Sequence, residues 1–179
     1  KYFGDSSLSD AFREGHDVHK FVASKVFHTP IEEITSLQRR FSKSISFAVV
    51  YGSAVGSVAE STGMTYEEAQ NLFDQFYKMF PGVNKYIEAM HQYASQYGCI
   101  RFPSGRIRHL PEALDPNNRS NFSQALRRSQ NSPIQGSASD VTVNAIVEFN
   151  RQARKMGLES KIVGTVHDSI YEDVSPGEL

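Results

Sequence analysis

The sequence has a single cysteine, no tryptophan and no long hydrophobic run, and these shortages exclude several classes of protein. Because Cys99 is alone, the chain cannot form an internal disulfide or a cysteine-based metal cluster. No apolar segment approaches the ~18 residues that suggest a membrane span. Residues 1–5 lack the apolar stretch and cleavage site of a signal peptide. We therefore expect a cytoplasmic protein without a membrane partner.

The net charge is only −1, which argues against a protein that coats nucleic acid by charge alone. The hydrophobic content of 39% is enough for a core, in one domain or in two interleaved lobes. Positive charge is concentrated between residues 101 and 135, which contain two acids and six arginines: Arg101, Arg106, Arg108, Arg119, Arg127 and Arg128. This segment is either a solvated basic face or a track for a phosphate backbone.

One helical stripe organises the sequence. Arg39, Lys43, Phe47 and Tyr51 recur at every fourth position before Gly52, so on an α-helix they cover an arc of about 120°. Two cations at this spacing can bind successive oxygens of a polyphosphate, and the aromatic rings beyond them can contact a base or sugar. The alternative is an ordinary amphipathic helix, with both rings in a core and both cations extended to solvent.

Local signals predict several further helices around this stripe. Asp17 is a candidate N-cap for residues 18–27, and capping boxes begin at Thr29 and at Thr65. Glycine and proline end the predicted segments. The expected helices cover residues 8–14, 18–27, a short segment after 29, about 36–51, 53–61, 66–80 and 82–97.

The second half of the sequence changes character at Cys99. Alternating residues around a Pro-Ser-Gly turn predict a β-hairpin over about 99–110 with arginines on one face. Residues 111–118 have a loop composition. A helix over 119–130 should then be broken or kinked at Pro133 before a longer helix continues to Met156.

The last predicted element is a second hairpin over residues 161–173, with Asp168 at or near its turn. His167, Asp168 and Ser169 are adjacent, but neighbours on a strand point to opposite faces, which excludes a hydrolase triad. On its own, an aspartate at a hairpin turn is also explained as a turn former.

Three separated motifs resemble those of the family A DNA polymerases. The stripe with its glycine resembles motif B, written Arg39-x3-Lys43-x3-Phe47-x3-Tyr51-Gly52. The template and primer segment of that family is similar to Arg127-x3-Asn131-x-Pro133-x-Gln135-Gly136-x3-Asp140. Motif C resembles Val166-His167-Asp168. The segments Gly4-Asp5, Asp17-Val18-His19 and Gly105-Arg106-x-Arg108-x-Leu110-Pro111 also occur in the family's order.

The resemblance implies template-directed DNA synthesis from deoxynucleoside triphosphates on primer-template DNA. His19, Arg39 and Lys43 would contact the triphosphate, and Lys43 would also protonate the leaving pyrophosphate. Phe47 would pack on the sugar and base, and Tyr51 would lie beside the templating base. Asp168 would be catalytic and would bind metal, with two Mg²⁺ ions in the complete enzyme. The implied DNA-binding residues are Gly52, Arg106, Arg108, Arg127, Asn131, Gln135 and His167.

The implied fold is α+β and mostly α: a helical fingers subdomain with part of the antiparallel-sheet palm of a right-hand polymerase. We expect a partial palm–fingers junction at 1–16, fingers at 17–117 and a partial palm, with the motif C hairpin, at 118–179. The resemblance also indicates a bacterial cell or a virus-infected host cell.

Two departures from the family pattern leave alternatives. Ser169 stands where many members of the family have Glu. The resulting His-Asp-Ser sequence resembles that of single-subunit RNA polymerases, so a fragment of such an enzyme is one alternative. Motif A, with the second metal-binding aspartate, and the thumb are not found in the sequence. We therefore expect the remainder of the polymerase as a partner and an inactive isolated chain. A non-catalytic nucleic-acid-binding module is the other alternative.

Overall fold

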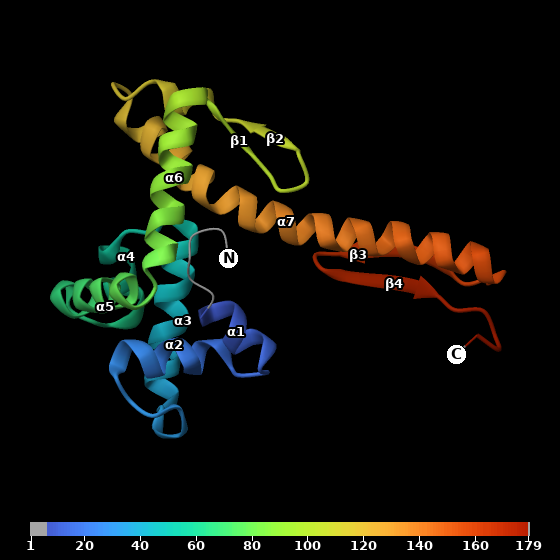
Figure 1. Cartoon of the computed structure of the whole chain (residues 1–179), viewed down its shortest axis with the longest axis horizontal. Helices are drawn as coiled ribbons and strands as arrows, with labels where there is room; N and C mark the ends of the chain where they lie inside the picture. The colour runs from blue at the N-terminus through green and yellow to red at the C-terminus, as the bar shows by residue number, and fades with distance from the viewer. Residues whose placement is uncertain (1–6, 179) are drawn as a thin grey trace. The chain divides into compact units, whose positions relative to one another are not determined.

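The computed structural model describes residues 7–178, which form helices and two small antiparallel hairpins (Figure 1). This confirms the predicted mostly helical α+β class. The chain divides into two compact units, one made of residues up to Ile100 with His109–Asn131, the other of Arg101–Arg108 with Ser132 onward. The helices are α1 (Ser7–Arg13), α2 (Val18–Phe27), α3 (Ser36–Tyr51), α4 (Val55–Thr62), α5 (Tyr66–Met79), α6 (Pro81–Tyr97) and α7 (Arg119–Met156). The expected Gly4-Asp5 segment lies outside the described residues.

The first unit is built around a hydrophobic core in which α2 packs against α3 and α5, and α4 packs against α5. Each helix contributes its apolar face, so the core follows from helical periodicity. Its buried members are Val22, Val26, Ile45, Ala48, Val49, Val58, Phe73, Phe76 and Phe80. Burial of this surface removes apolar area from water and is the main force that orders the unit.

The ends of α3 are defined by local chemistry. Thr35 accepts a hydrogen bond from the Gln38 backbone while the Gln38 side chain accepts one from the Thr35 backbone, which completes a capping box. At the other end Gly52 adopts φ 69°, and its N–H bonds back to the helix. The expected helix over 36–51 is therefore confirmed. Asp17 and Thr65 also cap α2 and α5 as predicted.

The predicted capping box at Thr29 is wrong. Its hydroxyl donates to the Phe27 carbonyl, the cap position is Pro30, and only a 3-10 turn at Ile31–Glu33 follows. The segment expected to be a loop after Leu110 likewise contains a 3-10 turn, Pro111–Leu114.

The second unit contains the last residue of β1 (Cys99–Arg101), the first two residues of β2 (Ile107–His109) and most of α7. The predicted hairpin is confirmed. The predicted break at Pro133 is wrong, because α7 runs through it without interruption. Proline removes one backbone donor, and the remaining ladder bonds on both sides are sufficient to continue the helix.

The last element is the hairpin of β3 (Lys161–Val166) and β4 (Ser169–Asp173), which pair antiparallel with Val166 opposite Ser169. His167 and Asp168 therefore form a two-residue turn, as expected for Asp168. His167 has φ 56°, which is unusual for a residue with a Cβ. A register shift between Ile162 and Gly164 marks an irregularity in β3.

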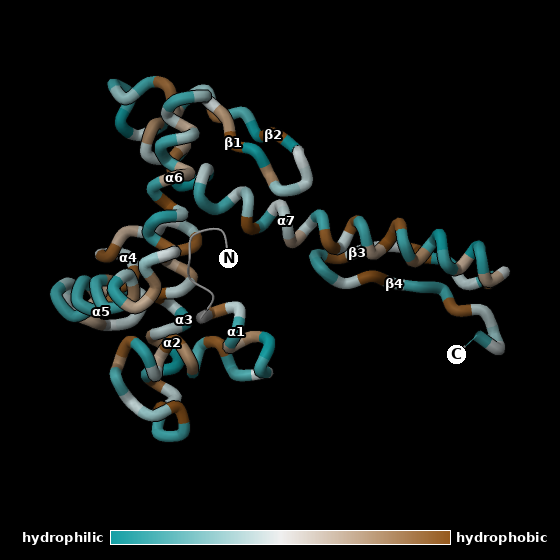
Figure 2. The backbone as a smooth tube through the Cα atoms, viewed as in Figure 1, coloured by the Kyte–Doolittle hydropathy of each residue, from teal (hydrophilic) through white to brown (hydrophobic). Residues whose placement is uncertain are grey.

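Many large apolar side chains of the second unit are exposed. Figure 2 shows hydrophobic positions along α7 and on both strands of the β3–β4 hairpin. The exposed members in this unit include Val141, Val143, Val147, Met156, Val163, Val166 and Tyr171. Among the described residues, no helix has the length and hydropathy to cross a bilayer.

Candidate nucleotide and DNA site

The stripe predicted on α3 forms a continuous surface. The rings of Phe47 and Tyr51 are stacked with centroids 6.1 Å apart and planes inclined by 20°. The Lys43 ammonium lies 5.8 Å from the centroid of Phe47, over its ring. The His19 ring, from α2, lies with its centroid 6.0 Å from that of Phe47. Cationic and aromatic groups are therefore adjacent, as a nucleotide would require.

The alternative that Phe47 and Tyr51 are core residues is excluded by their exposure. Each side chain is 44% exposed, whereas Ile45 on the opposite face is 1% exposed. The buried positions of α3 are Ser42, Ile45, Ala48 and Val49. Because the helix already has a separate core-facing side, its aromatic stripe is not needed for packing.

Arg39 is held by a carboxylate from another element. Its Nε and Nη2 both donate to Asp17 Oδ2 at 2.8 Å, while Asp17 Oδ1 accepts from the backbone N–H groups of His19 and Lys20. The hydrogen bond from Arg39 lowers the pKa of Asp17, so the carboxylate stays ionised at neutral pH. One side chain thus caps α2 and orients the Arg39 guanidinium.

His19 is partly buried between these groups. Burial lowers its pKa, and this effect outweighs the opposing effect of Asp17. The imidazole is therefore neutral at pH 7 and can offer a phosphate one N–H but no full charge. Its Nδ1 is buried without a hydrogen-bond partner.

The first unit also brings the start of α7 to the end of α3. A Cβ on Gly52 would lie 2.8 Å from Arg127 Cγ, so the two backbones approach closely at this glycine. The Arg127 guanidinium is exposed and donates to Ser123 Oγ. Asn131 lies one turn further along, and its Oδ1 is buried without a partner. The end of the predicted nucleotide-binding stripe and the predicted DNA-binding residue Arg127 are therefore neighbours.

The remaining predicted DNA-binding residues belong to the second unit, and the arginines among them contact other protein groups. Arg106 Nη2 lies 2.8 Å from Asp140 Oδ1 and donates to the Gly136 carbonyl, and its guanidinium lies over the Phe102 ring. Arg108 donates to Ser132 Oγ. The hairpin arginines therefore fasten the hairpin to α7. Gln135 is exposed on α7.

Asp168 and His167 are exposed at the tip of the β3–β4 hairpin. Among residues 7–178, no group of three or more His, Cys, Asp or Glu side chains is arranged to hold a metal ion. Mg²⁺, however, is commonly bound by one or two carboxylates together with substrate phosphates and water. The exposed Asp168 carboxylate is suited to be one of these ligands. It does not by itself form a complete metal site.

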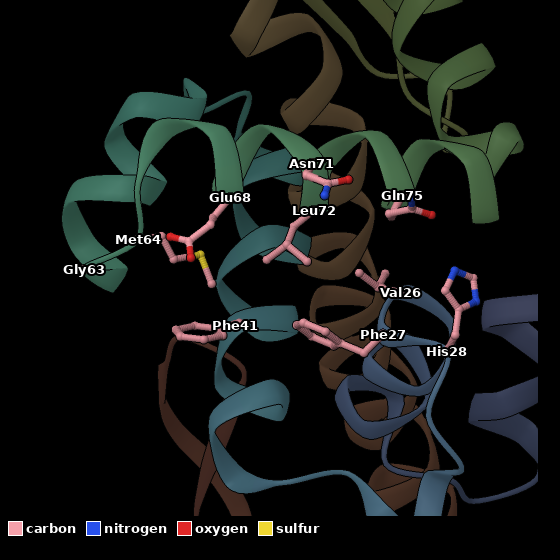
Figure 3. A pocket seen from close by; sticks show the side chains of 10 residues that line it. All are labelled: Val26, Phe27, His28, Phe41, Gly63, Met64, Glu68, Asn71, Leu72 and Gln75. Atoms are coloured by element: carbon pink, nitrogen blue, oxygen red, sulfur yellow. The ribbon is translucent and has the colours of Figure 1, made fainter.

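A hollow of about 580 Å³ opens among α2, α3 and α5 on a different side of α3 (Figure 3). Phe27, Phe41 and Leu72 point into it, with Gln75 and Glu68 at its polar edge. Around the helix axis, Phe41 is displaced by about 160° from Arg39 and Lys43 and by about 120° from Phe47. The hollow is therefore separate from the candidate nucleotide surface.

Sequence reasoning missed residues that hold the predicted site residues of each unit in place. Asp17 was expected only as a cap, and its ion pair with Arg39 joins positions 22 apart. Gln130, Phe102 and Asp140 were not singled out as supporting residues. Each acts through a contact between distant segments, for which a single sequence contains no local signal.

Known proteins are similar to this chain over nearly its whole length. The DNA polymerase I of Mycobacterium tuberculosis is 36% identical over 175 residues, covering 98% of this chain and 19% of that protein. The DNA polymerase of Bacillus phage SP01 is 34% identical over 183 residues, covering 99% and 20%. The chain thus spans about a fifth of the length of these relatives.

A solved structure is similar throughout the chain. The POL domain of Pol1 from M. smegmatis, in complex with DNA primer-template and dNTP, matches with a TM-score of 0.89 and 36% identity, over 97% of this chain and 30% of that one. The family model for DNA polymerase family A matches residues 1–179. Three ordered motifs, the surface on α3 and a match over the full sequence agree, and the chain belongs to DNA polymerase family A.

Proposed function

We propose that the protein containing this chain catalyses template-directed DNA synthesis, by transferring deoxynucleotides to the 3′ end of a primer. The observation that carries the proposal is the surface formed by His19, Arg39, Lys43, Phe47 and Tyr51. The named relatives are DNA polymerases, so the RNA polymerase alternative is not favoured. We assign residues 17–117 to fingers and 118–179 to part of a palm.

The chemistry of the α3 surface suits a deoxynucleoside triphosphate. Arg39, oriented by Asp17, and Lys43 donate to the phosphate oxygens, and His19 adds a neutral N–H. The exposed rings of Phe47 and Tyr51 receive the sugar and base by stacking. Lys43 is positioned to give a proton to the departing pyrophosphate, since its ammonium is a proton donor on the same surface.

The DNA would be contacted by the segment that follows. Arg127 lies beside the end of α3, where a nascent base pair would meet the stripe, and Asn131 follows it one turn along α7. Gln135, Arg106, Arg108 and His167 complete the proposed set in the second unit. Contacts from arginine to phosphates would orient the duplex. Polar contacts near the nascent base pair would favour a pair of the correct shape.

Asp168 would hold a magnesium ion with its carboxylate. When bound, the metal neutralises the charge that develops on the phosphate oxygens and orients them. A pair of ions needs more ligands than the single Asp168 carboxylate, so the remainder of the polymerase, with motif A and the thumb, is the expected partner. We also expect a cytoplasmic location and no primer extension by this chain alone.

The proposal is tested in the complete protein by primer extension with single-nucleotide addition. Asp168→Asn should lower the rate by on the order of 1,000-fold, because it removes a negative metal ligand. Lys43→Ala should lower it by on the order of 100-fold through loss of the phosphate contact and the proton donor.

Lys78→Ala is the matched control, because Lys78 is an exposed lysine on α5, away from the surface on α3. It should synthesise DNA at the unmodified rate. Full activity of Asp168→Asn would contradict the catalytic role and favour the non-catalytic binding module. Robust primer extension by the isolated chain would overturn the expected need for a partner.

A further inference from the structure

Gln130 is one of the buried polar side chains of the first unit, and it makes three hydrogen bonds to two other helices, α3 and α6. It is only 4% exposed. Its Nε2 donates to the Val49 carbonyl of α3 at 2.7 Å, and its Oε1 lies 2.8 Å from His91 Nε2 on α6. The hydroxyl of Tyr86, also on α6, donates to the Gln130 backbone carbonyl at 2.7 Å.

The donor and acceptor roles in this group are determined by chemistry. A backbone carbonyl can only accept, so the amide NH₂ of Gln130 faces Val49 and its oxygen faces His91. His91 must therefore carry its proton on Nε2. Burial raises the pKa of Tyr86 to about 12, so its hydroxyl remains a donor throughout the physiological range. All three bonds can form at the same time, and they make a network centred on Gln130.

The location of the network is informative. Val49 lies in the last turn of α3, where carbonyl groups lack partners from the helix itself. Its carbonyl receives the weak 3.4 Å bond from Gly52 N–H and the shorter bond from Gln130. A Cβ on Gly52 would meet Gln130 Nε2 at 3.1 Å. Gln130 thus contacts the end of the helix that presents Tyr51 and Gly52.

The backbone of Gln130 is also held from outside α7. The Tyr86 hydroxyl of α6 donates to the Gln130 carbonyl, so this residue is bound through its side chain and its main chain. The Gln130 side chain that contacts α3 therefore extends from a backbone position that α6 also binds.

We propose that Gln130 is a positioning residue that locks the carboxyl-terminal end of α3 to the start of α7. It would set Tyr51 and Gly52 relative to Arg127 and Asn131, and so define the position of the templating base. The expected effect on DNA synthesis rests on the proposed function. The contact between α3 and α7 is a property of the fold and does not depend on that function. Its expected effect is on the choice of the correct nucleotide, with little effect on triphosphate binding at Arg39 and Lys43.

The test uses the complete protein and two independent measurements on Gln130→Met, which keeps the length of the side chain and removes both of its hydrogen bonds. Hydrogen exchange of the peptide covering residues 46–54 should become faster by about ten-fold, because the end of α3 opens more often. In primer extension, the preference for correct over mismatched insertion should fall by about ten-fold, with the KM for the correct nucleotide changed less than about two-fold.

Ser129→Ala is the matched control. Ser129 is a fully buried neighbour on α7, but its hydroxyl donates to Leu126 within the same helix. Its removal should leave exchange in residues 46–54 unchanged. Equal exchange in the Gln130 variant and the unmodified protein would overturn the lock, and faster exchange with unaltered insertion preference would overturn the positioning role.

Tyr86→Phe supports the test if the Gln130 variant does not fold. It deletes one hydroxyl and should accelerate exchange of residues 46–54 in the same direction by a smaller factor; no acceleration would overturn the proposal. The two measurements also separate this inference from the proposed function. A complete protein that makes no DNA contradicts the function, while the exchange result still decides whether Gln130 locks α3.

Discussion

The two units of the chain differ in how they use their apolar residues. In the first, side chains such as Ile45, Phe76 and Phe80 are almost fully buried in one core. In the second, Val141, Val163 and several others are more than half exposed. Exposed apolar residues in such number on one unit usually mark a surface that another element covers.

The two units also differ in how firmly they hold the predicted functional residues. The candidate nucleotide surface rests on a helix whose opposite face belongs to a complete core, so its geometry needs no other chain. Asp168 is carried by a two-stranded hairpin, and an isolated two-stranded hairpin is only marginally stable. We therefore expect the phosphate-binding residues to be ordered by this chain alone, and Asp168 to be fixed only when the second unit is covered by the remainder of the protein.

The largest expected effect is on the core. Ile45→Ala removes a side chain that is 1% exposed and should lower the free energy of unfolding by about 2–5 kcal/mol, through lost burial and a cavity. Urea denaturation followed by circular dichroism measures it. A loss below about 1 kcal/mol would show that the first unit is not packed as a single core.

The next effect concerns the contact between the β1–β2 hairpin and α7. A Cβ at Gly136 would lie 1.9 Å from Phe102 Cε1, so Gly136→Ala should destabilise the second unit by about 1–3 kcal/mol despite alanine's better helix propensity. In a Phe102→Leu background the same change should be neutral or stabilising. Chemical denaturation of the four proteins of this cycle checks the prediction, and additive effects would contradict it.

A smaller effect is expected at Asp17. Asp17→Ala should cost about 1 kcal/mol, because it removes the cap of α2, while Asp17→Asn keeps a cap and should cost less. Since the folded-state pKa of Asp17 is lowered, its ionic contribution is present above the ordinary value of 3.8 and is lost as the pH falls through the lower folded value.

The measurement for Asp17 is the stability difference between the unmodified protein and Asp17→Asn at pH 7 and near pH 3. The difference should shrink at the lower pH. Because the pair is partly exposed, added salt should weaken it as well. A difference that grows on acidification would contradict the assigned ion pair.

The smallest effect is expected on the exposed face of the second unit. Val163 is 66% exposed, so Val163→Thr in the isolated chain should change stability by less than about 0.5 kcal/mol. In the complete protein the same substitution should cost more, because the covering element would bury Val163. Stability is measured by chemical denaturation. Equal effects in both proteins would contradict the expectation that another part of the protein covers the exposed apolar face of the second unit.

Much of the fold could be predicted from local sequence signals. Capping residues, glycines and periodicity defined α2, α3 and α5 almost to the residue, because these signals act within one or two turns. The two hairpins followed from turn residues between β-prone runs. The capping box predicted at Thr29 and the break predicted at Pro133 were wrong.

The sequence by itself determined the stripe on α3, its glycine stop and the turn that carries Asp168, since all three depend on residues close together in the chain. Only the tertiary structure decided that Asp17 holds Arg39, that Arg106 is paired with Asp140, and that Gln130 joins α7 to α3. Those contacts link residues 22, 34 and 81 positions apart. Which distant groups meet depends on how the whole core packs, and no local propensity records that.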